Sequence, residues 1–357
     1  MNQPRVLYLG HLHKGGTCLE RFLALKELGY EIEGFDTSGI WSGVSAPMRR
    51  LSWRLMVGSA VRQFNRSLER SAKKMHPDVV WFDKVVEVTP LTIKAIKERT
   101  RAILVHYNPD DPFGRYRVGW RLFRKAIPLY DLHLVARDQN IQEYMAFGAK
   151  RIERLYRGYS ERFHRPDDES GKPCAKLHEV GFIGSYERER AEILRYLTDR
   201  CFPLALWGRT WSRQYGQGGK NLTIYPEGVY AEDYVAAIRS CKINLNFLRA
   251  GNRDLSNSRA YEIPACGGFM LSERSAELED EFDDGKEVEF FSSKEEAADK
   301  IRYYLAHDVD RERIAANGRQ RCLECGYSYK SRMRQYMDIV NGMLDVRTSF
   351  YESGKEA

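Results

Sequence analysis

The sequence predicts an α/β protein made of two successive Rossmann-like domains, each with a parallel sheet. Short apolar runs alternate with longer amphipathic segments along nearly the whole chain, a pattern typical of strands joined by crossover helices. The chain has 357 residues, more than one hydrophobic core usually supports. Glycines and prolines among charged residues interrupt the alternation at 157–176, and we expect the interdomain linker there.

Twelve runs have the apolar character of buried strands. They are 6–9, 32–35, 79–82, 102–106, 132–136, 152–155, 179–183, 204–207, 222–224, 242–247, 269–271 and 287–291. Amphipathic segments at 18–28 and 51–75 are predicted helices. We expect one domain over residues 1–163 and a second over 164–327. The carboxyl ends of parallel strands can face the cleft between them, where ligands bind in open α/β sheets.

Composition and charge narrow the class of protein. The 43% hydrophobic and 30% charged residues are typical of a globular chain and argue against extensive disorder. No apolar run approaches the roughly 20 residues of a membrane span, and the N-terminus has no signal-peptide pattern. Seven scattered cysteines favour the reducing cytoplasm. The net charge of +7 favours anionic ligands or surfaces.

The loop after the first predicted strand reads G-H-L-H-K-G-G-T over residues 10–17. Gly15 and Gly16 let the backbone come close to a ligand, and the following helix offers free N–H groups. The spacing is not that of a dinucleotide fingerprint. A tight turn explains the glycines equally well, so both interpretations stay open.

The fourth predicted strand runs into V-H-Y-N-P-D-D-P. His106, Asp110 and Asp111 are titratable groups at a carboxyl end, where they can serve as acid, base or hydroxyl-binding groups on a sugar. Asp and Pro also favour turns, and adjacent carboxylates suit Mg²⁺. We predict that the three groups converge on the cleft edge as catalytic candidates.

The second domain opens with V-G-F-I-G-S-Y-E-R-E-R from residue 180. The predicted strand ends at Gly184, and a helix containing Arg188 and Arg190 begins after a polar turn. Helix amides and these arginines can hold a diphosphate. The neighbouring Glu187 and Glu189 can equally pair with the arginines on a solvated face.

The most specific segment is 253–271, which reads R-D-L-S-N-S-R-A-Y-E-I-P-A-C-G-G-F-M-L. Ser256 or Asn257 can cap a helix that ends at the paired glycines. The capped end would present amides to an anion. Glu262, eight residues after Asp254, can accept both hydroxyl groups of a ribose, as acidic residues do in dinucleotide folds.

This segment resembles the C-terminal domain of CgeB-like glycosyltransferases and, more broadly, retaining GT-B enzymes with an E-x7-E motif. The resemblance covers about residues 132–337, including the segment from residue 180 and the endings K-I-R-Y-Y-L and R-I-A-A-N-G-R. It implies a GT-B fold, with the acceptor mainly on the first domain and the nucleotide on the second. The final segment, 328–357, would form a helix that crosses back to the first domain.

The resemblance also implies roles for individual residues. Glu262 matches the glutamate that holds the ribose, and the first glutamate of the motif falls at Asp254, near the donor sugar. GT-B enzymes usually need no metal, so basic groups stabilise the departing diphosphate. The predicted nucleotide-sugar contacts in the second domain are Gly184, Arg188, Arg190, Tyr225, Arg253, Asn257, Ser258, Arg259 and Glu262.

Two basic stretches with interleaved apolar residues, 49–74 and 115–125, lie outside these motifs. The first can rest on an anionic membrane as an amphipathic helix or cover its own sheet, and we favour the sheet. The second is a candidate for docking a lipid-linked or other anionic acceptor. The pair Cys322 and Cys325 lacks further metal ligands nearby in sequence, which favours reduced thiols.

We therefore expect a cytoplasmic glycosyltransferase, with a possible peripheral contact at the inner face of the membrane. It would transfer a sugar, without a bound cofactor or metal, from a UDP-sugar by default, or from a GDP- or ADP-sugar. The acceptor would be a hydroxyl group of a glycan, a lipid-linked molecule or a protein. A non-catalytic nucleotide-sugar-binding protein and a nucleic-acid-directed sugar transferase are the alternatives.

Overall fold

The computed structural model describes residues 3–115, 118–165, 175–216 and 218–353. The chain divides into two compact units. The first unit contains residues up to Tyr156, the short segment Gly251–Arg253 and the residues from Lys330 onward. The second unit contains Arg157–Ala250 and Asp254–Tyr329. Of the linker expected at 157–176, residues 166–174 lie outside the described residues.

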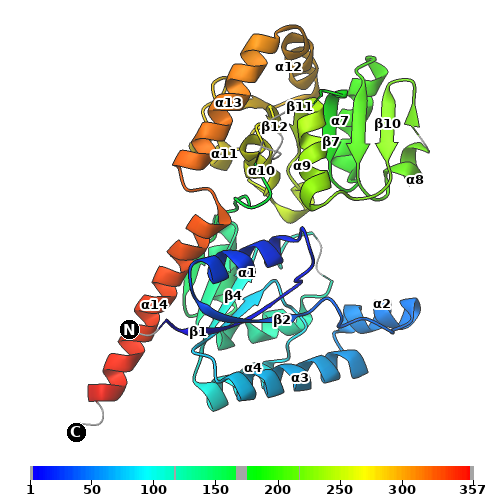
Figure 1. The fold of residues 1–357 in the computed structure, drawn as a ribbon. Coiled ribbons are helices and arrows are strands. Elements are labelled where there is room, and N and C mark those ends of the chain that lie inside the picture. The colour runs from blue at the N-terminus through cyan, green and yellow to red at the C-terminus, as the bar shows by residue number, and fades with distance from the viewer. Residues whose placement is uncertain (1–2, 116–117, 166–174, 217, 354–357) are drawn as a thin grey trace. The chain divides into compact units, whose positions relative to one another are not determined.

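The first unit contains a six-stranded parallel sheet of order β2-β1-β3-β4-β5-β6 (Figure 1). The order places β1 between β2 and β3, with β1 residues 6–9 in register with residues 79–82 of β3. The strands are β1 Arg5–Gly10, β2 Glu31–Asp36, β3 Val79–Asp83, β4 Ile103–Asn108, β5 Leu132–Val135 and β6 Ile152–Arg154.

The helices of this unit include those that bury the apolar strands of the sheet. They are α1 Thr17–Glu27, α2 Ala46–Leu55, α3 Ser59–Met75, α4 Pro90–Thr100, α5 Arg121–Ala126, a 3₁₀ turn η1 Ile127–Leu129, α6 Asp138–Ala146 and α14 Tyr329–Ser353. The core contains Leu7 and Leu9 of β1 with Phe82 of β3 and Leu68 of α3, all buried. Buried side chains of β1, β3 and α3 thus belong to one hydrophobic core.

The single helix predicted at 51–75 is wrong, because the chain forms two helices there. Met56 has a φ of 53° and Gly58 a φ of 120°, left-handed backbone that ends α2 before α3 begins. Val61, Phe64 and Leu68 on α3 are buried against the sheet. The prediction that the basic stretch 49–74 covers its own sheet is therefore confirmed for α3 and wrong for α2.

The second unit contains a seven-stranded sheet of order β13-β12-β11-β7-β8-β10-β9, in which only β9 is antiparallel to its neighbour among the described residues. The strands are β7 His178–Ile183, β8 Leu204–Trp207, β9 Gly218–Gly219, β10 Leu222–Tyr225, β11 Cys241–Asn246, β12 Met270–Glu273 and β13 Glu289–Phe291. Strands β7 and β11 lie side by side at the centre.

The helices of the second unit connect these strands (Figure 1). They are α7 Arg188–Asp199, α8 Trp211–Tyr215, α9 Ala231–Ser240, α10 Arg259–Ala265, α11 Ala276–Glu281, α12 Lys294–Ala306 and α13 Asp308–Glu324. A 3₁₀ turn, η2 Ala250–Asn252, begins in the second unit and continues into Gly251–Arg253 of the first unit. The predicted fold class and all twelve predicted strand positions are confirmed; among the described residues, β9 is the one strand that was not predicted. No helix in the described part combines the length and apolarity of a membrane span.

Candidate functional site

Three arginines gather where β7 and β11 end in the second unit. Arg190 lies in the first turn of α7, Arg249 follows β11, and Arg259 begins α10. The guanidinium carbons of Arg190 and Arg259 lie 5.4 and 5.6 Å from the ring centroid of Phe182. One aromatic ring therefore brings together two cations from separate helices.

Two carboxylates counter this charge. Oε1 of Glu187 lies 2.7 Å from Nε of Arg249, and its Oε2 lies 3.4 Å from Nη2 of Arg190. Glu273 accepts a 2.6 Å hydrogen bond from the amide of Leu248, and burial raises the pKa of its carboxyl group. Three guanidinium groups thus face two carboxylates. Of these two, Glu273 ionises less readily because of its raised pKa.

The surroundings of Arg190 lower the pKa of its guanidinium group. Burial, together with the nearby positive charge of Arg259, lowers the pKa of Arg190 to about 10. Nε of Arg190 and Nε of Arg259 are buried without a hydrogen-bond partner. Buried donors without partners are costly, and an anion placed between these groups would relieve both the charge and the missing hydrogen bonds.

Only two of the four arginines predicted for the diphosphate join this cluster. The side chain of Arg188 is 83% exposed and pairs with Glu192 at 3.1 Å, a solvated arrangement like the alternative but with a different glutamate. Arg253 belongs to the first unit. Arg249 was missed, although it follows a predicted strand at its carboxyl end, where ligands bind in open parallel sheets.

Gly184, at the end of β7, is tightly packed. Its carbonyl accepts a 2.6 Å hydrogen bond from Nε1 of Trp211, and its amide donates to the carbonyl of Trp207 at 2.8 Å. A Cβ atom at this position would lie 2.7 Å from Cζ of Phe182 and 3.4 Å from Nη1 of Arg190. The glycine therefore lets β7 pass closely beside the arginine cluster.

Glu262 lies on α10, next to Tyr234 and His164. The hydroxyl group of Tyr234 donates a 2.6 Å hydrogen bond to Oε2 of Glu262. Burial lowers the pKa of His164, an effect that the charge of Glu262 partly offsets. Glu262 itself is 7% exposed. Its carboxylate is thus held in one orientation by a neutral donor.

The helix carrying Glu262 is shorter than the predicted one and begins at Arg259. The N-cap residue is Ser258, whose side chain makes no capping hydrogen bond, so neither Ser256 nor Asn257 is the cap that the sequence predicted. Oδ1 of Asn257 nevertheless accepts a 3.1 Å hydrogen bond from the amide of Ala260 in the first turn. The amide group of Asn257 donates to Oδ1 of Asn246 and the carbonyl of Phe247. These contacts fix the helix to the end of β11.

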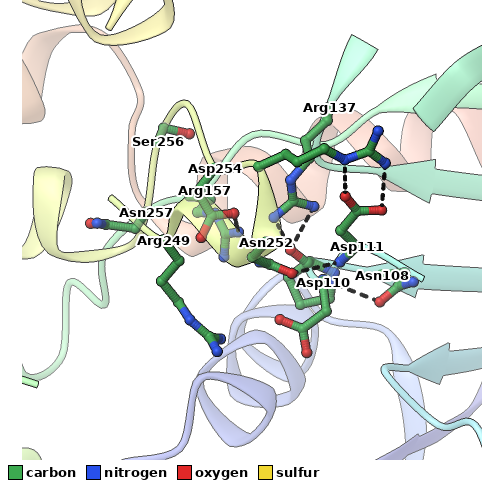
Figure 2. A network of polar contacts seen from close by, with 12 residues as sticks. Asn108, Asp110, Asp111, Arg137, Arg157, Arg249, Asn252, Asp254, Ser256 and Asn257 are labelled. Carbon is green, nitrogen blue, oxygen red and sulfur yellow. Dashed lines mark hydrogen bonds and ion pairs between the residues drawn. The ribbon is translucent and has the colours of Figure 1, made fainter. Parts of the chain in front are cut away.

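Ser258, Tyr225 and Asp254 have their own partners in the second unit. Oγ of Ser258 accepts from the hydroxyl of Tyr329 at 3.4 Å. Tyr225 stacks on Trp207 with centroids 4.8 Å apart. Asp254 pairs with Arg157 at 3.3 Å, and its side chain is only 3% exposed. Both residues of this ion pair appear in Figure 2.

In the first unit, His106 does not lie with the two carboxylates, contrary to the expected convergence. Its side chain is fully buried, and the ring lies 4.3 Å from Phe123 and 5.9 Å from His133 between centroids. Nε2 lies 3.2 Å from the carbonyl of Val85. Burial lowers the pKa of His106 well below its ordinary value, and His133 adds to this. His106 is a neutral part of the core.

Asp110 and Asp111 point in different directions (Figure 2). Asp110 pairs with the half-exposed Lys84 at 2.5 Å. Asp111 is buried and binds Arg253 with both carboxylate oxygens, at 2.5 and 2.9 Å. The amide of Asp111 donates to Oδ1 of Asn252 at 2.9 Å. Asp111 and Arg253 therefore hold the segment Gly251–Arg253 within the first unit.

The glycine loop after β1 forms a tight turn. The amide of Gly16 donates to the carbonyl of His13 at 3.0 Å. Gly15 has a φ of +76°, which side chains disfavour. A Cβ atom on Gly16 would lie 2.7 Å from the ring of His13. Turn geometry thus accounts for both glycines.

In the described residues, no cluster of three His, Cys, Asp or Glu side chains could hold a metal ion.

Comparison with known proteins places this geometry in a wider group. Residues 188–338, less than half of the chain, match the family model described as "Glycosyl transferase-like". This segment contains α7, β11 and α10, which carry the arginine cluster and Glu262. No curated protein matches the chain.

Solved structures match nearly the whole chain at low sequence identity. Sucrose-phosphate synthase from Thermosynechococcus elongatus has a TM-score of 0.69 at 12% identity, with 96% of this chain and 100% of that chain covered. Anabaena HepE in complex with UDP-glucose has a TM-score of 0.64 at 14% identity, with 95% and 100% covered. The α,α-trehalose 6-phosphate synthase from Burkholderia multivorans has 0.63 at 11%, with 97% and 100% covered.

The fold is GT-B. The two α/β units and these structural neighbours confirm that part of the resemblance. The family match adds that the segment bearing the arginine cluster is glycosyltransferase-like.

Proposed function

We propose that the protein is a glycosyltransferase that binds the diphosphate of a nucleotide-sugar with Arg190, Arg249 and Arg259. The observation that carries the proposal is the excess positive charge of this cluster beside Glu187 and Glu273. The cluster lies at the carboxyl ends of β7 and β11, the edge at which open parallel sheets bind ligands.

The reaction transfers a sugar from the donor to a hydroxyl group. The bond between the anomeric carbon and the diphosphate oxygen breaks, and the acceptor oxygen forms a bond to that carbon while its proton is released. Negative charge develops on the departing diphosphate. Preorganised guanidinium groups stabilise that charge without reorganising during the step, which supports a transfer that needs no metal.

Glu262 is proposed to bind the ribose of the donor. A carboxylate accepts hydrogen bonds from two neighbouring hydroxyl groups, and the hydrogen bond from Tyr234 holds it in place. Arg259 and Glu262 are separated by three residues on α10, so they lie on the same face of the helix. The diphosphate and ribose contacts are therefore adjacent.

The structure of HepE in complex with UDP-glucose supports a UDP-sugar as the first donor to test, with GDP- and ADP-sugars next. Retention of the anomeric configuration is proposed from the resemblance to the E-x7-E superfamily. For the first unit, Gly15 and Gly16 stay proposed donor contacts, because their loop follows the carboxyl end of β1. Asp110 stays a proposed contact to donor or acceptor, since it is partly exposed beside Lys84. His106 and Asp111 take no part, because His106 packs among the rings of Phe123 and His133 and both carboxylate oxygens of Asp111 bind Arg253.

A thermal-shift screen with UDP, GDP, ADP, CMP and their sugars tests the binding function. A ligand at 100 times its Kd adds about 2.7 kcal/mol of stability, enough to raise Tm by several degrees. We expect a shift with at least one nucleoside diphosphate and a smaller shift with its nucleoside. No shift with any of them at millimolar concentration would refute the donor site.

A non-catalytic nucleotide-sugar-binding protein is the second candidate. It is favoured by one observation, the burial of Asp254 against Arg157, which keeps that carboxylate from a donor sugar. Release of nucleoside diphosphate from the donor that gives the largest thermal shift separates the two. We expect release that increases with an acceptor mixture of oligosaccharides; binding without any release would identify a binding protein.

A further inference from the structure

Helix α2 exposes an apolar stripe. Met48, Leu51 and Leu55 are 56%, 55% and 41% exposed, and their spacing of three and four residues places them on one helix face. Ser52 and, just beyond the helix, Met56 make its buried contact with the first unit. In Figure 1, α2 projects from the edge of this unit. A contiguous exposed apolar surface commonly marks an interaction site.

Positive charge accompanies the stripe. The sequence from Thr37 to Leu68 contains no Asp or Glu. Arg49, Arg50 and Arg54 lie on α2, all three are exposed, and none has an ion pair in the described part of the chain. The stripe therefore lies beside uncompensated guanidinium groups.

A second basic segment joins α2. Nη1 of Arg121 donates a 3.5 Å hydrogen bond to the carbonyl of Leu55. Gly119, with a φ of +88°, packs on Trp53, where a Cβ atom would lie 2.8 Å from Cζ2. Val118 beside it is 45% exposed. The two stretches that the sequence marked separately, 49–74 and 115–125, thus meet at α2.

We call this region the α2 surface and define it by nine residues. Its members are Met48, Leu51, Leu55, Val57 and Val118, which are apolar, and Arg49, Arg50, Arg54 and Arg121, which are basic.

We propose that the α2 surface docks the protein on a bilayer of anionic phospholipid. An interfacial helix inserts its apolar stripe at the level of the acyl-chain boundary while arginines reach the phosphates from its polar flank. Charge complementarity selects an anionic surface. Exposed aliphatic side chains along one stripe favour lipid over nucleic acid, which is contacted chiefly through phosphate groups, base edges and base stacking.

Vesicle co-sedimentation tests the proposal with the full chain. We expect binding to vesicles of phosphatidylcholine with phosphatidylglycerol, weak binding to phosphatidylcholine alone, and a decrease with salt, since ions screen charges beyond about 10 Å at 0.1 M. Binding of equal strength to both vesicle types, or to neither, would overturn the proposal.

Two variants divide the apolar and basic contributions. Replacing Arg49, Arg50 and Arg54 together by Gln should weaken binding by about fivefold per arginine, on the order of 100-fold in all. Replacing Leu51 and Leu55 together by Ser should weaken binding by about tenfold or more and remove binding that survives high salt. All five side chains are exposed, so Tm should stay at the wild-type value.

Matched controls lie on α12 and α13 of the second unit. Lys294, Arg302 and Arg313 are 49%, 65% and 54% exposed, and replacing them together by Gln removes the same charge elsewhere. Val309 and Leu323 are 82% and 49% exposed and serve as the apolar control. Equal losses of vesicle binding in the control and α2 variants would show that binding depends on net charge or on exposed apolar side chains anywhere on the protein, and not on the α2 surface.

The alternative occupants give different results. If α2 joins two copies of this chain, the Leu51 and Leu55 variant loses a dimer seen by sedimentation velocity while vesicles do not bind. If it contacts nucleic acid, the arginine variant loses affinity for DNA that the leucine variant keeps. Either result overturns membrane docking. A blue shift in Trp53 emission with anionic vesicles, absent in Trp53→Phe, supports it.

Discussion

The hydroxyl group of Tyr234 donates a 2.6 Å hydrogen bond to Oε2 of Glu262. Burial, followed by the charge of Glu262, raises the pKa of Tyr234 well above its ordinary value, so the phenol remains a donor. A fixed carboxylate on α10, three residues from Arg259, is what the proposed ribose contact requires.

The first prediction concerns this carboxylate. Glu262→Ala should raise the Kd for UDP by about 10- to 100-fold, because hydrogen bonds to a charged group contribute about 1.5–3 kcal/mol. Titration calorimetry with UDP and its 2′,3′-dideoxy analogue gives the control: the variant should lose little affinity for the analogue. An equal loss for both ligands would contradict a ribose contact.

Tyr234→Phe tests the support of Glu262 separately. Removing one hydrogen bond leaves the carboxylate buried and less well oriented, and we expect a smaller loss of UDP affinity, about tenfold or less. The hydroxyl is expected to act through Glu262 alone. In the Glu262→Ala background, Tyr234→Phe should therefore change the Kd for UDP very little, and a further full loss would show that the two act independently.

The arginine cluster gives the second prediction. Arg190→Met should raise the Kd for UDP by on the order of 30-fold or more, as expected when one partner of a buried charge pair is removed. Affinity for uridine, which has no phosphate, should be unchanged. Arg188→Met removes an equally charged but 83% exposed side chain from the same helix and should leave both affinities near wild type. A similar loss of UDP affinity in both variants would show that the net positive charge of the protein, and not the position of Arg190, determines binding.

How far the sequence predicts this site depends on local rules. The rule that ligand groups follow parallel strands selects Arg190 after β7, and applied consistently it also selects Arg249 after β11. Arg259 and Glu262 are candidates because they share the predicted helix before β12 and match the family motif. The hydrogen bond from the amide of Ala260 to Asn257 is in keeping with the preference of Asn for helix N-termini, although the N-cap residue is Ser258. These features depend on short-range geometry, which a single sequence carries.

Other features depend on contacts that no local pattern contains. Residues 103–108 of β4 are all buried, because a covered parallel sheet buries both faces of its strands. No alternation therefore shows that His106 points into the core. Likewise Asp111 binds Arg253 across 142 positions of sequence, and Asp110 beside it pairs with Lys84 instead. Long-range pairing decides which of two adjacent aspartates is buried.

That buried pair gives the third prediction. Asp111→Asn should destabilise the first unit by about 1.5–3 kcal/mol, because it removes the buried one of the two carboxylates, Asp111 and Glu143, that pair with Arg253. Asp110→Asn, whose partner Lys84 is half-exposed, should cost less than about 1 kcal/mol. Urea unfolding measures both. Hydrogen exchange of peptides spanning 251–253 should increase only in Asp111→Asn; equal protection in both variants would contradict the role of Asp111.

The fourth prediction is a loss of stability in mild acid from buried imidazoles. Burial lowers the pKa of His133 to about 4, whereas an unfolded chain protonates histidine near pH 6.5, about the usual value. Between these values the unfolded state binds more protons, so the free energy of unfolding falls as the pH falls through that window. Each imidazole contributes a slope of about 1.4 kcal/mol per pH unit.

His133→Gln isolates this contribution. Nε2 of His133 lies 2.9 Å from the carbonyl of Ile127, and a glutamine amide can keep that hydrogen bond without titrating. Urea unfolding between about pH 6.5 and pH 5 should show a slope smaller by about 1.4 kcal/mol per pH unit in the variant. His106, whose pKa burial also lowers, should supply part of the remaining slope. Identical slopes in wild type and variant would show that His133 is protonated in the folded protein or does not limit its acid stability.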